Sequence, residues 1–507
     1  MRGRGRGAVS CGGRRGNVTV IEGIPRRQPV REPAARTYAR SLPVVPVRAR
    51  GLTIEGADGR RYLDCLSGAG TLPLGHNHPV VLEAVRKVLD SGAPLHVLGV
   101  ATPVEDAFVA ELVRTLPPGL ARHARVEFCG PAARDAVDAA LRLVRAASGR
   151  PGILAFTGAH HGAAADPVGS ASGAGTLRLP YPQDYRCPFG IGGPQGAELA
   201  ARWAESLLDD PLSGLPRPAG MIVEAVQGEG GVLPAPDAWL RRMRRITAER
   251  SLPLIADEIH TGVGRTGAFW AVQHSGVTPD VMVLSDAIGG SLPLSAIVYR
   301  DDLATARPGD RAPGPRGNQL AMAAGAATLS YVRENRLPER AADLGTRMLS
   351  RLRALADAFP CVGEVRGRGL MIGVELVREE GAGAGASGGA VVSGGGVTSE
   401  DAALAFGGGV ASADAALVPC GGVVPGDAAL APGSGPVPRP AAPELAAAVQ
   451  RECLRRGLIV GLGGRHASVV RLLPPLTITD EQATAVLDRL ADAVQAAALR
   501  TPSEEAP

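Results

Sequence analysis

The sequence predicts an α/β fold built around a mostly parallel β-sheet. Short apolar runs, each typical of a strand buried on both faces, alternate with helical patterns along the middle of the chain. The segments between them carry apolar residues at helical spacing, as residues 135–147 and 237–250 do. The predicted strands are residues 126–128, 153–156, 221–226, 252–256, 281–284 and 296–299.

Length, charge and cysteine content exclude several other classes of protein. The 507 residues suffice for two or three domains with a large core. The 54 basic and 50 acidic residues leave a net charge of +4, too small for a general nucleic-acid or membrane-surface binder. No apolar run could span a membrane and no apolar signal core starts the chain, so we expect a soluble, cytoplasmic protein. The seven cysteines are scattered without a Cys-x-x-Cys pair, which indicates buried free thiols and no structural zinc.

Composition divides the chain into folded and low-complexity parts. Residues 1–36 open with alternating Arg and Gly and carry no acid before Glu22, which predicts a disordered arm. Residues 379–442 are mostly Gly, Ala, Ser, Val and Pro, and repeats begin at positions 394, 407 and 420, a period of 13 residues. So few apolar anchors predict a flexible insert, with a small solenoid of stacked repeats as the alternative. Globular patterning resumes over residues 443–498, and residues 499–507 form a tail.

Polar residues follow two of the predicted strands, where ligands of parallel sheets bind. Asp257, Glu258 and His260 follow one run, and Asp286 follows another. Carboxylates and imidazoles together can bind a divalent cation, so these residues leave a metal-dependent hydrolase open as one interpretation. Their spacing does not require a metal, and we predict no metal site.

Three further features bear on the chemistry. Residues 130–135 lead into a predicted helix N-terminus, where free N–H groups and the helix dipole attract anions. Arg471 lies in the segment Val-Arg-Leu-Leu-Pro-Pro, and its guanidinium could hold a carboxylate in a bidentate manner. Lys87 is the one lysine of the chain, so a mechanism that needs a lysine amine has a single candidate.

The order of the motifs along the chain is more specific than any one of them. As a set they resemble the class III aminotransferases of fold type I, and within these the diaminobutyrate–2-oxoglutarate group. The resemblance covers residues 37–375 and 444–497. The matching motifs are residues 62–70, 75–79 (Gly-His-Asn-His-Pro), 181–190, 226–231 (Val-Gln-Gly-Glu-Gly-Gly), 264–267 (Gly-Arg-Thr-Gly) and 316–319.

The resemblance implies a fold, a cofactor and a reaction. A large domain, residues 81–335, would hold a mostly parallel sheet of the seven-stranded type flanked by helices, and residues 37–80, 336–378 and 443–498 would form a small α+β domain. Class III aminotransferases use pyridoxal phosphate, held as an imine by a lysine. The implied reaction moves an amine from L-2,4-diaminobutyrate to 2-oxoglutarate. A threonine of the neighbouring subunit completes the phosphate site, which implies a dimer.

Some positions carry the residues of the family. Asp257 matches the aspartate that pairs with the pyridine nitrogen of the cofactor. Arg471 matches the arginine expected to bind the α-carboxylate of the substrate. Glu224 and Gln227 fall within the strand and turn that flank the cofactor. We therefore expect these residues at the site.

Other positions depart from the family pattern. Asp286 stands where the pattern Leu-Ser-Lys-Ala-Ile-Gly-Gly has its lysine, and a carboxylate cannot form an imine; by the layout of the family, Lys87 is too distant to replace it. His160 takes the place of the stacking tyrosine, and Gly314 that of the phosphate-site threonine. The phosphate turn has lost its hydroxyl donors, although an arginine could add charge; its residues are Gly130, Ala132, Ala133 and Arg134.

These departures predict a changed function. Each lost phosphate donor costs about 1–3 kcal/mol, and the covalent link is lost as well. We expect pyridoxal phosphate to bind weakly or not at all, and ordinary transamination to be absent.

Three alternatives stay open. The first is a lysine-independent enzyme that holds pyridoxamine phosphate without a covalent bond and uses Asp286 as base, helped by His160 or His260. The second is a non-catalytic partner, in a homodimer or in a heterodimer with an intact relative. The third is an active transaminase, acting on amino acids and 2-oxo acids as homology would suggest.

Overall fold

The computed structural model describes residues 42–96, 100–161, 175–304, 317–378 and 437–499. The chain divides into two compact units, residues 1–45 and 46–507. Of the first unit only residues 42–45 are described, and they form no helix or strand. The predicted arm, residues 1–36, lies outside the described residues. All described helices and strands belong to the second unit.

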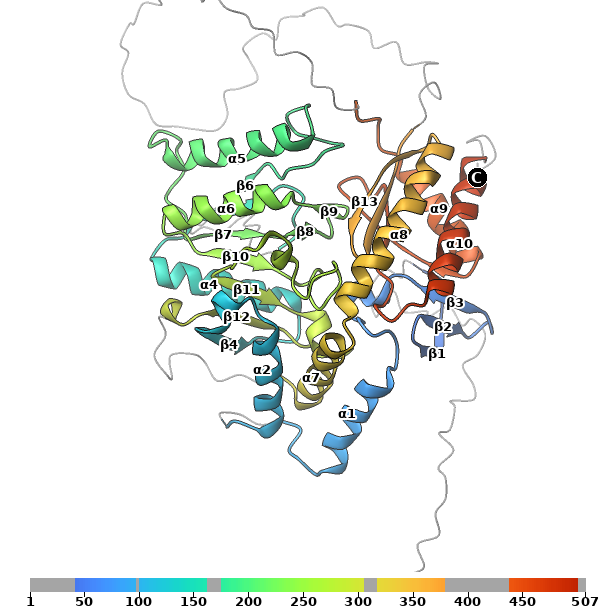
Figure 1. Ribbon diagram of the computed structural model, residues 1–507, viewed down its shortest axis with the longest axis horizontal. Coiled ribbons are helices and arrows are strands. Elements are labelled where there is room, and N and C mark those ends of the chain that lie inside the picture. The colour runs from blue at the N-terminus through green and yellow to red at the C-terminus, as the bar shows by residue number, and fades with distance from the viewer. Residues whose placement is uncertain (1–41, 97–99, 162–174, 305–316, 379–436, 500–507) are drawn as a thin grey trace, which may run out of the picture. The chain divides into compact units, whose positions relative to one another are not determined.

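A seven-stranded sheet forms the centre of the second unit (Figure 1). In this sheet β12 is antiparallel to both of its neighbours, and every other neighbouring pair is parallel. The predicted α/β class with a mostly parallel sheet is therefore confirmed. In sheet order the strands are β4 (Ala124–Phe128), β12 (Ala296–Arg300), β11 (Val281–Leu284), β10 (Leu254–Asp257), β7 (Gly220–Val223), β5 (Ile153–Phe156) and β6 (Thr176–Leu179).

Two differences from the predicted strands have physical reasons. The edge strand β6 was not predicted, because three of its four residues are only half-buried and its sequence, Thr-Leu-Arg-Leu, is not an apolar run. The predicted strand 221–226 ends early, at Val223, because the chain leaves the sheet at Glu224. It continues into a short two-stranded ribbon, β8 (Val226–Gln227) and β9 (Leu233–Pro234).

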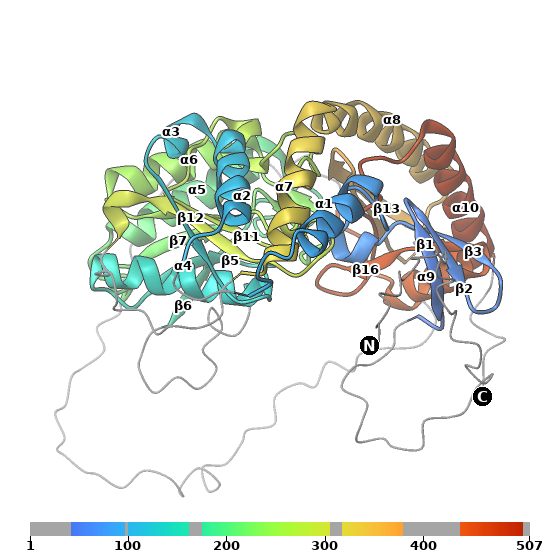
Figure 2. The same ribbon diagram turned by 90° about the horizontal axis from the view of Figure 1, so that it is seen from below.

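Different helices cover the two faces of the sheet, since alternate residues of a strand point to opposite faces. Helix α4 covers one face, where its buried side chains cluster with Ile222, Ile255 and Ile297. Helices α2, α5, α6 and α7 cluster with the residues of the other face, such as Met221 and Leu254. Figure 2 shows α4 across the sheet from α2, α5 and α6. The helices are α2 (Pro103–Thr115), α4 (Ala133–Ser148), α5 (Gly193–Asp209), α6 (Asp237–Glu249) and α7 (Gln319–Glu334).

The second unit has two smaller four-stranded sheets, and the first of them combines strands from both ends of the chain. One has the order β1–β2–β3–β15, in which β15 pairs in parallel with β3; the other has the order β13–β14–β17–β16. Their strands are β1 (Pro46–Arg50), β2 (Thr53–Gly56), β3 (Arg61–Asp64), β13 (Val362–Arg368), β14 (Met371–Leu376), β15 (Leu458–Ile459), β16 (Gly461–Gly463) and β17 (Val469–Leu472). The remaining α-helices are α1 (Pro79–Asp90), α3 (Pro118–Ala121), α8 (Leu337–Ala358), α9 (Pro443–Arg455) and α10 (Asp480–Ala498). The domain boundaries drawn from the sequence stay predictions.

The burial of the cysteines and the apolar length of the helices are known for the described part of the chain only. Cys65 and Cys453 are free and buried, Cys187 is free and half-buried, and Cys129 and Cys361 are buried. Cys11 and Cys420 lie outside the described residues. None of the described helices is both long and apolar enough to cross a membrane.

The two ends of the predicted insert lie side by side. Val377 and Ala441 form an antiparallel bridge, and the N–H of Arg378 donates to the carbonyl of Pro440 at 2.9 Å. Residues 437–442, which the sequence assigned to the insert, thus belong to the described fold. Residues 379–436, with all three repeats, lie outside the described residues.

We expect a variant in which a short Gly/Ser linker replaces the 58 residues from 379 to 436 to keep the fold. The chain ends to be joined are already hydrogen-bonded. A shorter loop lowers the entropic free-energy cost of loop closure by about 2 kcal/mol at most. Thermal unfolding followed by circular dichroism measures this. A midpoint well below that of the full chain would contradict the independence of the fold from the insert.

Candidate functional site

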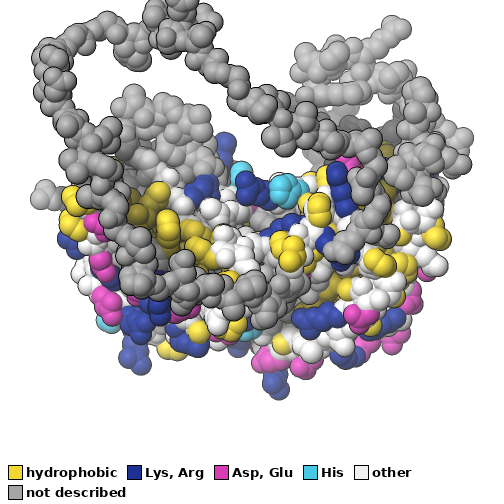
Figure 3. Space-filling view, turned by 90° about the horizontal axis from the view of Figure 1, so that it is seen from above, with side chains coloured by type: hydrophobic (Ala, Val, Ile, Leu, Met, Phe, Trp, Pro, Cys, Tyr) yellow, Lys and Arg dark blue, Asp and Glu magenta, His cyan; other side chains and the backbone are white. Residues whose placement is uncertain are grey.

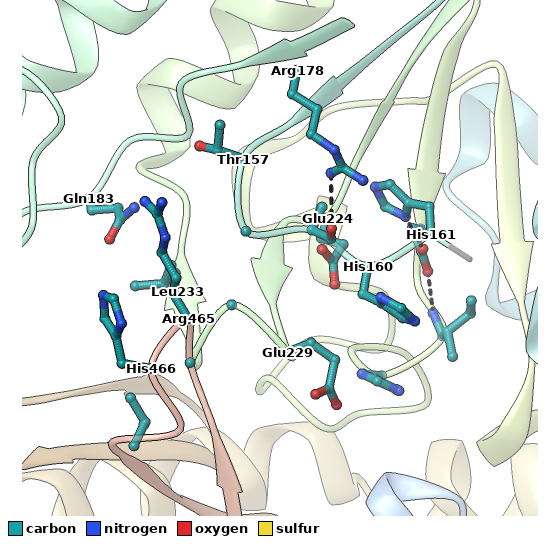
Figure 4. Close-up of a pocket in the computed structure, with 18 of the residues that line it drawn as sticks. Thr157, His160, His161, Arg178, Gln183, Glu224, Glu229, Leu233, Arg465 and His466 are labelled. Atoms are coloured by element: carbon teal, nitrogen blue, oxygen red, sulfur yellow. Dashed lines mark hydrogen bonds and ion pairs between the residues drawn. The ribbon is translucent and has the colours of Figure 1, made fainter. Parts of the chain in front are cut away.

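A cavity of about 1080 Å³ opens at the carboxyl edge of the central sheet (Figure 4). Segments that follow β5, β7 and β10 line it together with the first turn of α4. The loop between β16 and β17, residues 464–468, closes another part of the wall. The sequence predicted a site where strands end, and several of the predicted residues do line this cavity: Ala132, Ala133, Arg134, His160, Glu224, Asp257 and His260.

Asp257, the last residue of β10, is buried and bonded to a histidine. Its Oδ2 lies 2.9 Å from Nδ1 of His161, and its Oδ1 accepts the N–H of Ile259 at 3.1 Å. Burial alone would lower the pKa of His161, but the hydrogen bond and charge of Asp257, with the charge of Glu224, outweigh it and raise this pKa. The imidazole therefore tends to keep its proton beside the carboxylate. The other ring nitrogen, Nε2, is buried and has no hydrogen-bond partner among the described residues.

Glu224 lies just beyond β7, the strand between β5 and β10. One carboxylate oxygen accepts the N–H of Gly228 at 3.3 Å, while Oε2 is buried and has no partner within the described chain. Burial raises the pKa of Glu224 to about 8, with the negative charge of Asp257 adding to the effect and the charge of His161 opposing it. At neutral pH this carboxyl group is mostly protonated.

Gln227 is fully buried beside Glu224 but behind the cavity wall. Its Nε2 donates to the carbonyl of Thr157 at 3.0 Å, and its Oε1 is without a partner in the described structure. Gly158 leaves room for this side chain, because a Cβ there would lie 2.6 Å from the Gln227 Oε1. Gln227 thus holds the loop that carries His160 and His161.

We call His161, Glu224 and Asp257 the floor of the cavity. Asp286 lies close to this floor but does not line the cavity. It begins the short helix η4 (Asp286–Gly289) after β11 with a φ of +55°, a left-handed conformation in which an aspartate is uncommon. Ser285 Oγ donates to its Oδ1 at 3.4 Å. Burial raises the pKa of Asp286, the charge of Asp257 adds to this, and the charge of His260 opposes it. The aspartate chain is short, so its carboxylate stays beside His260 and Asp257.

The single lysine is far from this chemistry. Lys87 lies on α1, its side chain is 73% exposed, and its Nζ pairs with Glu83 at 2.9 Å. No lysine is among the residues that line the cavity. The expectation that Lys87 cannot serve the site agrees with this placement.

The turn that the resemblance assigns to a phosphate and the arginine that it assigns to a carboxylate have different surroundings. The N–H of Ala132 donates to the Oδ2 of Asp135 at 3.0 Å, and Arg134 lines the cavity with a largely exposed side chain. Arg471 does not line the cavity; its Nη1 donates to the Oε1 of Glu229 at 2.7 Å. Although burial favours the neutral acid, the positive charge of Arg471 holds the pKa of Glu229 below its usual value. Gly314 lies outside the described residues.

The metal-site interpretation is wrong for the described residues. No group of three or more His, Cys, Asp or Glu side chains there could hold a metal ion. Glu258 instead joins two segments of the chain, because its carboxylate accepts the hydroxyl of Thr261 and the N–H groups of Ala271 and Val272, at 3.0 and 2.9 Å for the latter two. Burial raises its pKa to about 7. These bonds tie the chain after β10 to η3 (Ala271–Ser275).

Sequence reasoning missed several basic and polar residues of the wall. Arg178 Nη1 donates to the carbonyls of Phe156 and Ala159, at 3.1 and 3.0 Å, and so supports the loop after β5. Gln183, Arg465 and His466 line the cavity from loops that follow β6 and β16. Gln183 follows β6, a strand that the sequence did not predict. Arg465 and His466 follow β16, which belongs to a different sheet. A search at the ends of the predicted strands therefore could not find these residues.

Basic and acidic side chains are unevenly distributed on the surface. In the view of Figure 3, basic and histidine side chains gather in the middle of the face, and most acidic side chains lie toward its rim. Such a field favours the approach of anionic ligands.

We expect the free energy of unfolding to fall as the pH rises from about 5 to about 8. Glu224 and Glu258, with pKa values of about 8 and 7 against 4.5 for an ordinary glutamate, bind protons more tightly in the folded state. Their contribution is complete below the unfolded pKa and is lost as the pH rises through the folded values. Glu224→Gln removes one of these groups, so the stability of this variant should depend less on pH. Urea unfolding at a series of pH values measures it.

Glu444→Gln, at an exposed carboxylate on α9, is the control and should keep the pH dependence of the unmodified protein. Equal slopes for Glu224→Gln and the unmodified protein would contradict the raised pKa of Glu224.

Comparison with known proteins identifies relatives over nearly the whole chain. A family model described as aminotransferase class-III matches residues 34–397. The diaminobutyrate–2-oxoglutarate aminotransferase of Rhizobium meliloti is 45% identical over 483 residues, 92% of each chain. That of Haemophilus influenzae is 36% identical over 92% of this chain and 94% of its own. Among solved structures, an amine transaminase from an uncultivated Pseudomonas species, in its pyridoxal phosphate-bound internal aldimine form, is 26% identical with a TM-score of 0.71, covering 94% of this chain and 99% of its own.

Proposed function

This chain belongs to the class III aminotransferases, and from that premise we propose that it is a diaminobutyrate aminotransferase-like protein that has lost ordinary transamination. The family uses pyridoxal phosphate. That cofactor supplies an aldehyde, which an amine of the protein captures, and a ring that accepts electrons. The proposal rests on how the residues of this cavity compare with those needs.

The observation that carries the proposal is the absence of a lysine from the cavity. The one lysine of the chain is exposed on α1 and paired with Glu83. By the resemblance of residues 284–290 to the lysine motif of the family, Asp286 stands in the place of the lysine. A carboxylate cannot condense with an aldehyde, and it adds negative charge near Asp257.

The other residues fit the cofactor only in part. Asp257 offers a buried carboxylate for a protonated ring nitrogen, and His161 holds it in place. The first turn of α4 offers backbone N–H groups and the charge of Arg134, but no hydroxyl at residues 132–134. The cavity therefore fits non-covalent contacts with a pyridine and a phosphate, and it does not fit a covalent link.

We expect no pyridoxyl adduct at any residue of the cavity after the protein is mixed with pyridoxal phosphate, reduced with borohydride and measured by peptide mass spectrometry. Asp286→Lys restores an amine to the floor, so this variant should form one adduct at position 286. Lys87→Arg, alone and combined with Asp286→Lys, removes the exposed amine and controls for labelling of the surface. An adduct at the cavity of the unmodified protein would contradict the proposal.

A second candidate is an enzyme that holds pyridoxamine phosphate non-covalently, with Asp286 as the base. It is favoured by the position of Asp286 beside His260 and by burial, which raises the pKa of Asp286 toward that of a useful base. We expect calorimetry to show binding of pyridoxamine phosphate but not of pyridoxal phosphate in this case. Asp286→Asn should keep the binding and abolish exchange of the C4′ protons of the bound pyridoxamine phosphate with solvent in the presence of a 2-oxo acid. Undiminished exchange in that variant would exclude Asp286 as the base.

A further inference from the structure

We propose that the cavity contains two subsites for an amphoteric ligand held without a covalent bond. A cationic amine of the ligand binds Glu224, and an anionic group at its other end binds Gln183, Arg465 and His466. The inference rests on the proposed function. If no lysine of the protein reaches the floor, the amine of a ligand can take its place there.

The cation subsite stands on the surroundings of Glu224. The residue is only 8% exposed, and its Oε2 has no hydrogen-bond partner among the described residues. A buried carboxyl group without a partner is costly, and an ammonium group would supply the missing donor and the opposite charge. In Figure 4 the carboxylate of Glu224 lies within the cavity, near His160 and His161.

The charged groups that face Glu224 come from four elements. His161 follows β5, Asp257 ends β10, Glu229 follows β8, and Arg178 belongs to β6. Asp257 and Glu229 each have a cationic partner, His161 and Arg471. The Nη1 of Arg178 is bonded to two backbone carbonyls. Among these three acids, Glu224 is therefore the one with a carboxyl oxygen that has no partner within the described residues and could bind a cation.

The anion subsite lies across the cavity. Figure 4 places Gln183, Arg465 and His466 together on the side opposite Glu224 and His161. All three line the cavity, and no side-chain hydrogen bond or ion pair is formed by Arg465 or His466 within the described residues. By contrast, Arg186 and Arg366 of the same wall are paired with Glu375.

The partners of Arg471 and Arg465 decide which arginine meets the ligand. Arg471, the residue that the resemblance assigns to a carboxylate, is paired with Glu229. Arg465 and His466 offer a guanidinium and an imidazole, and Gln183 adds an amide, so that a carboxylate or a phosphate finds several donors. Acidic floor and basic side thus complement a ligand with one charge of each sign.

Calorimetric titration of the isolated protein tests the proposal. L-2,4-Diaminobutyrate, L-ornithine and L-lysine probe a carboxylate ligand of increasing length, and pyridoxamine phosphate probes a phosphate ligand. 1,3-Diaminopropane lacks the anionic group. We expect at least one of the first four ligands to bind, and 1,3-diaminopropane to bind at least tenfold more weakly.

Matched variants locate the two subsites. Glu224→Gln and Arg465→Ala should each weaken binding at least tenfold, whereas Glu444→Gln and Arg451→Ala, at exposed positions of α9, should not change it. Arg465 is exposed, so Arg465→Ala keeps the test decisive even if Glu224→Gln unfolds.

Proton release gives an independent readout. Glu224 binds a proton when the floor holds no cation and loses it when an ammonium group arrives. Titrations at pH 7 in buffers with different ionisation heats should therefore show release of a proton, and Glu224→Gln should show none.

The proposal is overturned if no diamino acid and no pyridoxamine phosphate binds, or if binding is indifferent to both Glu224→Gln and Arg465→Ala. Tight binding of pyridoxamine phosphate that depends on both residues supports it with a phosphate as the anion. A borohydride-reducible adduct at a residue of the cavity would overturn the proposed function instead, and the two failures are thus distinguishable.

Discussion

The hydrogen bond between His161 and Asp257 is the interaction on which the cavity floor depends. It joins the loop after β5 to the end of β10, and Glu224 projects from β7, the strand between them. Without a proton on His161, two neighbouring acids would face each other in a poorly solvated site. The pair therefore determines both the shape of the floor and the charge that Glu224 can carry.

In the proposed function, the acidic floor lies where the class III aminotransferases have the amine of a lysine. Asp286, in a left-handed conformation after β11, adds a further carboxyl group beside Asp257 and His260. Asp257 still ends β10 and a turn still leads into α4, although residues 132–134 of that turn carry no hydroxyl. The proposed function therefore combines a retained binding cavity with the absence of a lysine nucleophile.

The outer wall of the cavity is continuous with the place where the insert joins the fold. Arg186 and Arg366 share Glu375, and Nη2 of Arg186 donates to the carbonyl of Arg439 at 2.9 Å. Arg439 lies just before the bridge between Val377 and Ala441. An insertion at this point leaves the sheet undisturbed because its two ends are already paired.

The sequence alone determined the fold class, since buried parallel strands read as apolar runs and the helices between them as amphipathic patterns. It also located Asp257 and the α4 turn, because residues at strand ends meet at one edge of a parallel sheet, whereas Glu224 was assigned to the site through the family resemblance. That the chain has one lysine, at position 87, is also read directly from the sequence. The edge strand β6 was not visible, because a half-buried strand carries no apolar run.

Only the tertiary structure decided how these groups are partnered. It paired Arg471 with Glu229, placed Glu258 against Ala271 and Val272, kept Asp286 behind the wall, and brought Arg465 and His466 into the cavity. Which side chains form hydrogen bonds and ion pairs depends on the distances between residues far apart in the sequence, such as Arg471 and Glu229. Residue types and local spacing carry no information about such distances, whereas burial and periodicity are local properties that a sequence records.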